Sequence, residues 1–208
     1  MRFVLFILAL TMPVAAMAEK LMPLDESASD PTFVEFKNRL LAAIQRKDIT
    51  TLVSVLDPQV RVNADGDAGV DAFRRQWQLD KLAPSRLWDE LGTVLRLGAT
   101  RDDGEFIAPY VFTRFPHTRD AQTHFAVLRA AADLRSAPSP TATKVATLQH
   151  DIVQRVGVPK GGWVEVRTDD KQTGWLQETE LRSPMDYRAF FEQKQGRWKL
   201  TAFLNGGD

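Results

Sequence analysis

The chain has 208 residues, enough for one medium-sized domain or two small ones. Hydrophobic residues make up 44% and charged residues 26%, as in ordinary globular proteins. Lys and Arg together number 27, and so do Asp and Glu. This balance argues against a nucleic-acid ligand, and the lack of cysteine excludes disulfides, thiolate metal sites and cysteine nucleophiles in this sequence.

Residues 1–18 have the pattern of a secretory signal peptide. Arg2 supplies the positive charge, and residues 3–10 form an apolar run too short to anchor the chain across a bilayer. The tripeptide Ala16-Met17-Ala18 is an A-x-A cleavage site. A buried N-terminal helix, the alternative, fits poorly with the abrupt change to polar sequence at Glu19. We expect cleavage after Ala18 and a periplasmic or secreted protein without stable membrane insertion.

The next hundred residues predict a helix-rich α+β region. Residues 19–29 are polar and are expected to form a flexible lead-in. Asp30 and Pro31 then give the N-cap and first position of an amphipathic helix reaching Arg46. We further expect helices over 49–56, 70–79 and 85–97, a short strand over 60–62, and an aromatic strand or strand pair over 106–115, interrupted at Pro109.

From Phe125 the pattern changes to short β-strands separated by turns. The apolar or alternating runs lie at 125–128, 145–148, 152–158, 163–167 and 174–176. Between the first two lies the Pro/Ser/Thr-rich stretch ADLRSAPSPTAT, which can be a linker or the first strand and loop of a barrel. Regular strands follow it, and this favours a small closed β-barrel.

Three stretches carry a family resemblance: ADLRSAPSPTATKVATL, GGWVEVR and TGWLQETEL. In order and spacing they resemble a bacterial SH3 domain over residues 127–183. The departures are Ala132-Asp133 where the family usually has Leu-Asn, Ala137 where Gly is common, and Trp175 where Tyr is usual. The resemblance implies an SH3-like barrel that binds cell-wall peptides or other exported partners, with no catalytic residues of its own.

A bound peptide would lie between the first loop of the barrel and its third strand. The peptide-binding candidates there are Arg135, Trp163 and Trp175. Each has a structural alternative, because Trp163 and Trp175 can pack on the barrel and Arg135 can be a solvated residue at a strand end.

The chain continues after the barrel with a predicted hairpin, whose strands are 187–193 and 198–204. Phe190, Trp198, Leu200 and Phe203 are too apolar to remain without a sheet. We therefore expect one α+β domain made of residues 30–124 and 185–208, with the barrel, residues 125–184, inserted before the terminal hairpin. A cone-shaped sheet of the nuclear-transport-factor type is one candidate for this domain.

No sequence motif for catalysis or metal binding is complete. Asn63, Asp65 and Asp67 alternate as in a calcium loop, but Arg74 stands where the loop needs Glu. His117 and His124 could meet at a metal but match no motif. Trp77, Trp88, Tyr110 and Phe112 can line a pocket in the first domain, although core packing is favoured for all four. We expect no metal and no cofactor.

The sequence thus predicts an exported, non-catalytic binding or scaffolding protein of the bacterial cell envelope. In this interpretation the barrel recognises a cell-wall peptide or an envelope protein. An envelope hydrolase or small-molecule-binding protein, with its pocket in the α+β domain, is the alternative. A purely structural module that stabilises an oligomer is a third hypothesis.

Overall fold

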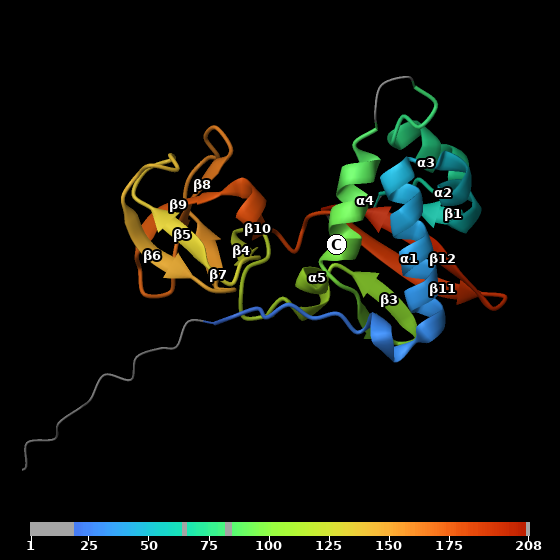
Figure 1. Cartoon of the computed structure of the whole chain (residues 1–208), viewed down its shortest axis with the longest axis horizontal. Coiled ribbons are helices and arrows are strands. Elements are labelled where there is room, and N and C mark those ends of the chain that lie inside the picture. The colour runs from blue at the N-terminus through green and yellow to red at the C-terminus, as the bar shows by residue number, and fades with distance from the viewer. Residues whose placement is uncertain (1–18, 64–65, 82–84, 207–208) are drawn as a thin grey trace, which may run out of the picture.

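The computed structural model describes residues 19–63, 66–81 and 85–206. It contains a helix-rich α+β part and a β-barrel (Figure 1). The predicted signal peptide, residues 1–18, lies outside the described residues, as does Asp65 of the calcium-like loop. Among the residues described, no helix has the length and apolar character needed to cross a membrane. The predicted α+β class is confirmed.

Helix α1, Pro31–Arg46, begins where the sequence predicts. The Asp30 carboxylate accepts hydrogen bonds from the backbone N–H groups of Thr32 and Phe33, so it caps the first turn. The helix ends at Lys47, which adopts left-handed backbone geometry. The other elements of this part are α2 Ile49–Val55, β1 Leu56–Arg61, α3 Val70–Gln76, α4 Leu87–Arg96, β2 Thr100–Asp102, β3 Glu105–Ala108, α5 Tyr110–Arg114, β11 Arg188–Lys194 and β12 Arg197–Leu204.

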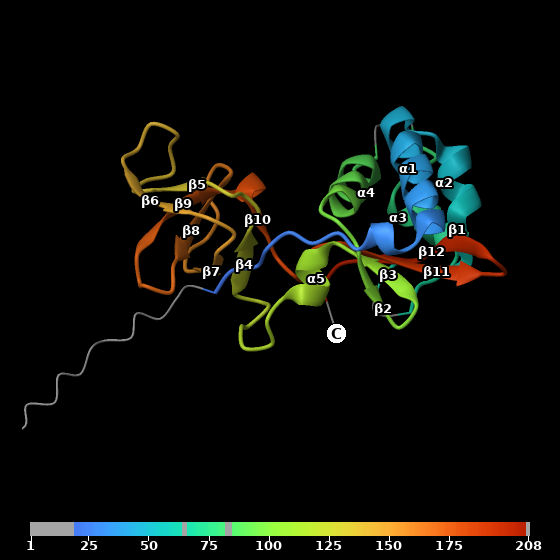
Figure 2. The same cartoon turned by 60° about the horizontal axis from the view of Figure 1, so that its bottom comes forward.

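The strands of this part form one sheet in the order β1-β12-β11-β3-β2. Strand β1 runs parallel to β12 and the other neighbours are antiparallel. Helices α1 and α4 lie on one face (Figure 2). The core between helices and sheet is aromatic, and the rings of Phe33 and Phe106 stack at 3.9 Å between centroids.

The barrel lies between β3 and β11 in sequence. Its sheet has the order β10-β4-β7-β8-β9-β5-β6. Its interior is lined by small aliphatic residues such as Leu134, Val166 and Leu176. The strands are β4 His124–Val127, β5 Ala132–Arg135, β6 Lys144–Leu148, β7 Ile152–Arg155, β8 Trp163–Arg167, β9 Thr173–Gln177 and β10 Leu181–Arg182.

The predicted strand over 106–115 is only half right. Residues 105–108 form β3, but Tyr110–Arg114 form helix α5. The helix buries Tyr110 and Val111 against Ala126 and Ile152 of the barrel, and this packing overrides the β-propensity of the aromatic residues.

The expected flexible lead-in, residues 19–29, is instead an ordered strap along both parts of the molecule. At its start, Leu21 is 5% exposed and its N–H donates to the carbonyl of His150 in the barrel. Further on, Glu26 bonds to Arg114 and to the backbone N–H of Arg101. We predicted flexibility from the polar composition of this segment, but its polar side chains form hydrogen bonds within the protein.

Asp25 fixes the middle of the strap to helix α1. Its carboxylate accepts hydrogen bonds from Lys37 at 2.6 Å, from the hydroxyl of Ser27 at 2.5 Å and from the backbone of Ala99 at 3.2 Å. Burial works to raise the pKa of Asp25, but the bonds from Lys37 and Ser27 outweigh it and the pKa lies below its usual range. The ionised form is therefore the one the fold holds.

The topology predicts that the last strands are needed by the α+β part and not by the barrel. A chain ending at residue 184 lacks β11 and β12, the partners of β1 and β3. We expect its calorimetric trace to lose the transition of the α+β part and keep that of the barrel. Two cooperative transitions in the truncated protein would contradict an inserted barrel.

Candidate functional site

Strands β5, β9 and β8 present one outward-facing surface, which we call the outer face. Side chains alternate along each strand, so Leu134, Leu176 and Val164 point into the barrel while their neighbours point out. Register places Arg135 opposite Trp175, and Trp175 opposite Glu165. The three residues predicted from the sequence, Arg135, Trp163 and Trp175, therefore share the outer face, and each is half-buried.

Arg135 and Trp163 line the same small pocket on the outer face. It has a volume of about 150 Å³, and its other walls are Ala131, Asp133, Pro140, Gln177 and Glu180. Trp175 does not line it and lies one position along β9 from the buried Leu176. The sequence thus found two of the pocket's side chains. It missed the acidic ones because an isolated Asp or Glu near a turn carries no pattern.

The side chain of Arg135 forms hydrogen bonds within the protein. Its guanidinium donates to the carboxylate of Asp133 at 2.8 Å and to the carbonyl of Ala142 at 3.0 Å. The second contact holds the loop 136–143, which brings Pro140 to the pocket wall. Arg135 is therefore a positioning residue rather than a free cation on the surface.

The charges of the pocket lining do not cancel. Asp133 and Arg135 form an ion pair at 2.8 Å and neutralise each other. Glu180, which accepts a hydrogen bond from the backbone N–H of Gln177 at 3.3 Å, then gives the lining one net negative charge and shares this lining with Trp163. Lys144 lies outside the lining, 3.5 Å from Asp133. A carboxylate next to an aromatic surface suits a ligand group that is positively charged.

Residues 129–183 match the family model for the bacterial SH3 domain. The chain contains a bacterial SH3 domain. The sequence resemblance over 127–183 is thereby confirmed, and the domain indicates a protein-binding module. No curated protein matches the chain.

A larger cleft lies where the SH3 domain meets helix α4. Its volume is about 800 Å³, and it is lined by Asp89 and Glu90 of α4, by Arg86 just before this helix, and by Phe125, Arg155 and Arg182 of the barrel. Sequence analysis could not find this cleft, because its walls come from segments almost a hundred residues apart. The alternative of a pocket within the α+β domain stays open, since a smaller pocket of about 420 Å³ is lined by residues of that part, Trp77 and Tyr187 among them.

Arg182 is the buried charge at this border. It donates to the carbonyl of Tyr187 at 2.7 Å, and its Nε lies 3.4 Å from the carboxylate of Asp186. Its Nη1 lies 4.0 Å from Glu90 on α4. The barrel also contributes Arg155, whose guanidinium lies 5.5 Å from the ring centre of Phe125.

The remaining sequence candidates have structural roles. Trp88 and Tyr110 are buried in apolar clusters, and Phe112 packs edge-on against Phe190. Trp77 is 6% exposed and stacks on Phe203, while its edge lines a side pocket beside the cleft.

The polar side chains of the two weak metal candidates form local hydrogen bonds. In the calcium-like loop, Asn63 accepts a hydrogen bond from the backbone N–H of Asp67. His124 bonds to its neighbours Asp120 and Thr123. Across the described part of the chain, no cluster of three or more His, Asp or Glu side chains could hold a metal ion.

Gly174 sets the spacing of the outer face. A Cβ at this position would lie 2.7 Å from the carbonyl oxygen of Arg135 and 2.7 Å from Cγ of Leu134, so β9 can approach β5 only without a side chain here. We expect Gly174→Ala to lower the free energy of unfolding of the SH3 domain by about 1–3 kcal/mol through overpacking. Urea denaturation measures this, with the exposed Thr173→Ala as control. Equal stability of the two variants would contradict the close approach.

Proposed function

We propose that this protein is an exported binding or scaffolding protein of the cell envelope, and that it recognises a cell-wall peptide or an envelope protein. The observation that carries the proposal is the pocket formed by Trp163 with Glu180 on the outer face of the SH3 domain. We further propose that residues 30–124 and 185–208 form one domain and residues 125–184 the other. In this proposal the domain of residues 125–184 has the binding role.

The pocket favours a peptide that carries an amino group. At about 150 Å³ it accommodates one side-chain end rather than a whole small molecule. An ammonium group can lie over the indole of Trp163 and pair with Glu180. The rest of an extended peptide would then cross the outer face toward Trp175, along the row that contains Arg135 and Glu165.

Export is supported by the sequence alone. The charged, apolar and small-residue regions of 1–18 occur in the order that signal peptides require. Cleavage after Ala18 would release a chain that begins at Glu19, in the periplasm or outside the cell.

The cleft between α4 and the SH3 domain favours a second candidate, a small-molecule-binding role. Its volume lies within the usual range for ligand sites. Its lining carries charges of both signs: Arg155 and Arg182 are positive, and Glu90 and Asp186 are negative. Such a lining suits a zwitterionic ligand.

A sedimentation assay with purified peptidoglycan sacculi distinguishes the two sites. We expect residues 19–208 to sediment with sacculi and Trp163→Ala to lose at least ten-fold in affinity, because the ring forms one wall of the pocket. Arg155→Ala, in the cleft, is the matched control and should bind as the unmodified protein does. Circular dichroism of each variant shows whether it is folded.

Two results would count against this assignment. Loss of binding in Arg155→Ala alone would move the site to the cleft and support the second candidate. An unmodified chain that stays in the supernatant at all concentrations would overturn binding to the cell wall, and envelope proteins would then be the partners to test.

A further inference from the structure

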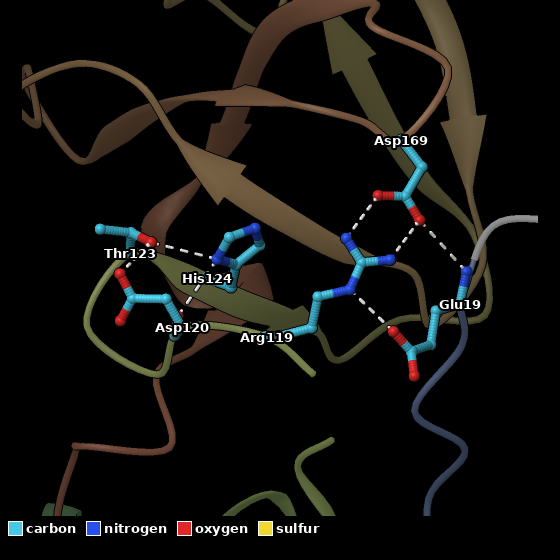
Figure 3. A network of polar contacts seen from close by, with 6 residues as sticks. All are labelled: Glu19, Arg119, Asp120, Thr123, His124 and Asp169. Atoms are coloured by element: carbon cyan, nitrogen blue, oxygen red, sulfur yellow. Dashed lines mark hydrogen bonds and ion pairs between the residues drawn. The ribbon is translucent and has the colours of Figure 1, made fainter. Parts of the chain in front are cut away.

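The backbone nitrogen of Glu19 lies next to a carboxylate of the SH3 domain. It is 3.4 Å from Oδ2 of Asp169, in the turn between β8 and β9 (Figure 3). The side chain of Glu19 is held as well, since its carboxylate accepts a hydrogen bond from Nε of Arg119 at 2.7 Å. The residue that follows the predicted cleavage site is thus fixed by both its backbone and its side chain.

Arg119 holds Asp169 in place for this contact. Its two terminal nitrogens donate to the two carboxylate oxygens at 2.8 Å each, the bidentate geometry that fixes a carboxylate plane. Both side chains are about three-quarters buried. Burial works to raise the pKa of Asp169, but hydrogen bonds from Arg119 and from the Glu19 backbone outweigh it and the pKa is lowered.

We propose that the carboxylate of Asp169, oriented by Arg119, binds the α-ammonium group of the mature protein's own N-terminus, while Arg119 pairs with the side-chain carboxylate of the same residue. The inference rests on the proposed export and on cleavage after Ala18. In that cleavage a peptidase adds water across the Ala18–Glu19 bond, so Ala18 keeps the new carboxylate and Glu19 keeps the new amino group. At neutral pH this amino group binds a proton and becomes a cation.

Cleavage changes what the nitrogen of Glu19 can do at an unchanged position. As a peptide nitrogen it offers one neutral N–H to Asp169. As an ammonium it offers three donors and a positive charge to a carboxylate that is already ionised and oriented. Charge-assisted bonds of this kind are about twice as strong as neutral ones. The site therefore binds the processed chain more tightly than the precursor.

Glu19, bound in this way, fixes the start of the strap. The carbonyl of Glu19 accepts from the N–H of Ile152 at 3.1 Å, and the N–H of Leu21 donates to the carbonyl of His150 at 2.8 Å. Leu21 then packs into the apolar cluster that contains Tyr110 and Ile152. Cleavage at the N-terminus therefore affects the joint between the SH3 domain and the α+β part, that is, the apolar cluster of Leu21, Tyr110, Val111, Ala126 and Ile152.

Backbone hydrogen exchange tests this inference directly. Two forms of residues 19–208 are compared, one with a free amino group at Glu19 and one acetylated there, each verified by intact mass. At pH 6.5 we expect the amides of Leu21 and Ile152 to exchange about three-fold faster in the acetylated form, the effect of losing one partly exposed ion pair.

Two variants assign the effect to its partner. In Asp169→Asn the free and acetylated forms should exchange at the same rate, because the anion is gone. In Asp170→Asn, whose carboxylate bonds instead to Thr168 and Gln172, the three-fold difference should remain. Equal rates for the two forms of the unmodified protein, or a difference that persists in Asp169→Asn, would overturn the inference.

The pH dependence gives a second readout. An ion pair raises the pKa of the ammonium in the folded state, so its stabilisation is complete below the unfolded value of about 7.7–8.0 and is lost as the pH rises through the folded value. The charged groups near it are Asp169, Arg119, Lys171 and the Glu19 carboxylate. The difference between the two forms should vanish by pH 9.5, and its persistence there would contradict an ammonium.

Binding of the N-terminal ammonium group and the position of the cleavage site are measured independently. The exchange comparison uses a chain that begins at Glu19 by design, so it decides amine capture on its own. The intact mass of the protein collected from the periplasm of an expressing bacterium tests the cleavage site. A mature N-terminus other than Glu19 would overturn the cleavage after Ala18, whatever the exchange rates show.

Discussion

The five-stranded sheet can be completed only by the last strands of the chain. Strand β12 pairs with β1, and β11 pairs with β3, so the final hairpin fills the centre of a sheet whose other strands come before residue 109. The chain must therefore leave this sheet after β3, form the SH3 domain and return. The SH3 domain is thus held at the ends of two connections to this sheet.

The two connections do not act alone at this joint. A small apolar cluster brings together Leu21 from the strap, Tyr110 and Val111 from α5, and Ala126 and Ile152 from the SH3 domain. Arg182 adds polar contacts to Tyr187 and Asp186 at the exit of the barrel. The cleft between α4 and the SH3 domain lies next to this joint. Its shape is therefore set by the same contacts that fix the orientation of the two parts.

Local patterns in the sequence predicted the elements and the SH3 domain well. The alternation in GGWVEVR placed β8, and Asp30-Pro31 placed the start of α1. The outward positions of Arg135, Trp163 and Trp175 follow from the same alternation. These features depend on neighbours a few residues apart, which is the information that periodicity carries.

Periodicity along the sequence could not predict contacts between segments that lie far apart in the chain. The strap looked flexible because its polar residues find their partners far along the chain, as Glu19 does with Arg119 and Asp169. Helix α5 was predicted as a strand because the contacts of Tyr110 and Val111 are with a barrel that begins ten residues after the helix ends. The acidic wall of the pocket on the outer face was missed for the same reason, since Glu180 and Trp163 line one pocket only after the barrel closes.

The contacts of the strap and of the apolar cluster around Tyr110 hold the SH3 domain and the α+β part together as one body. Backbone ¹⁵N relaxation of residues 19–208 measures the rotational diffusion of each part separately. We expect one diffusion tensor for both parts, with a correlation time that fits the whole chain. Two different tensors, each with the shorter correlation time of a small domain, would show that the two parts move independently and are not held as one body.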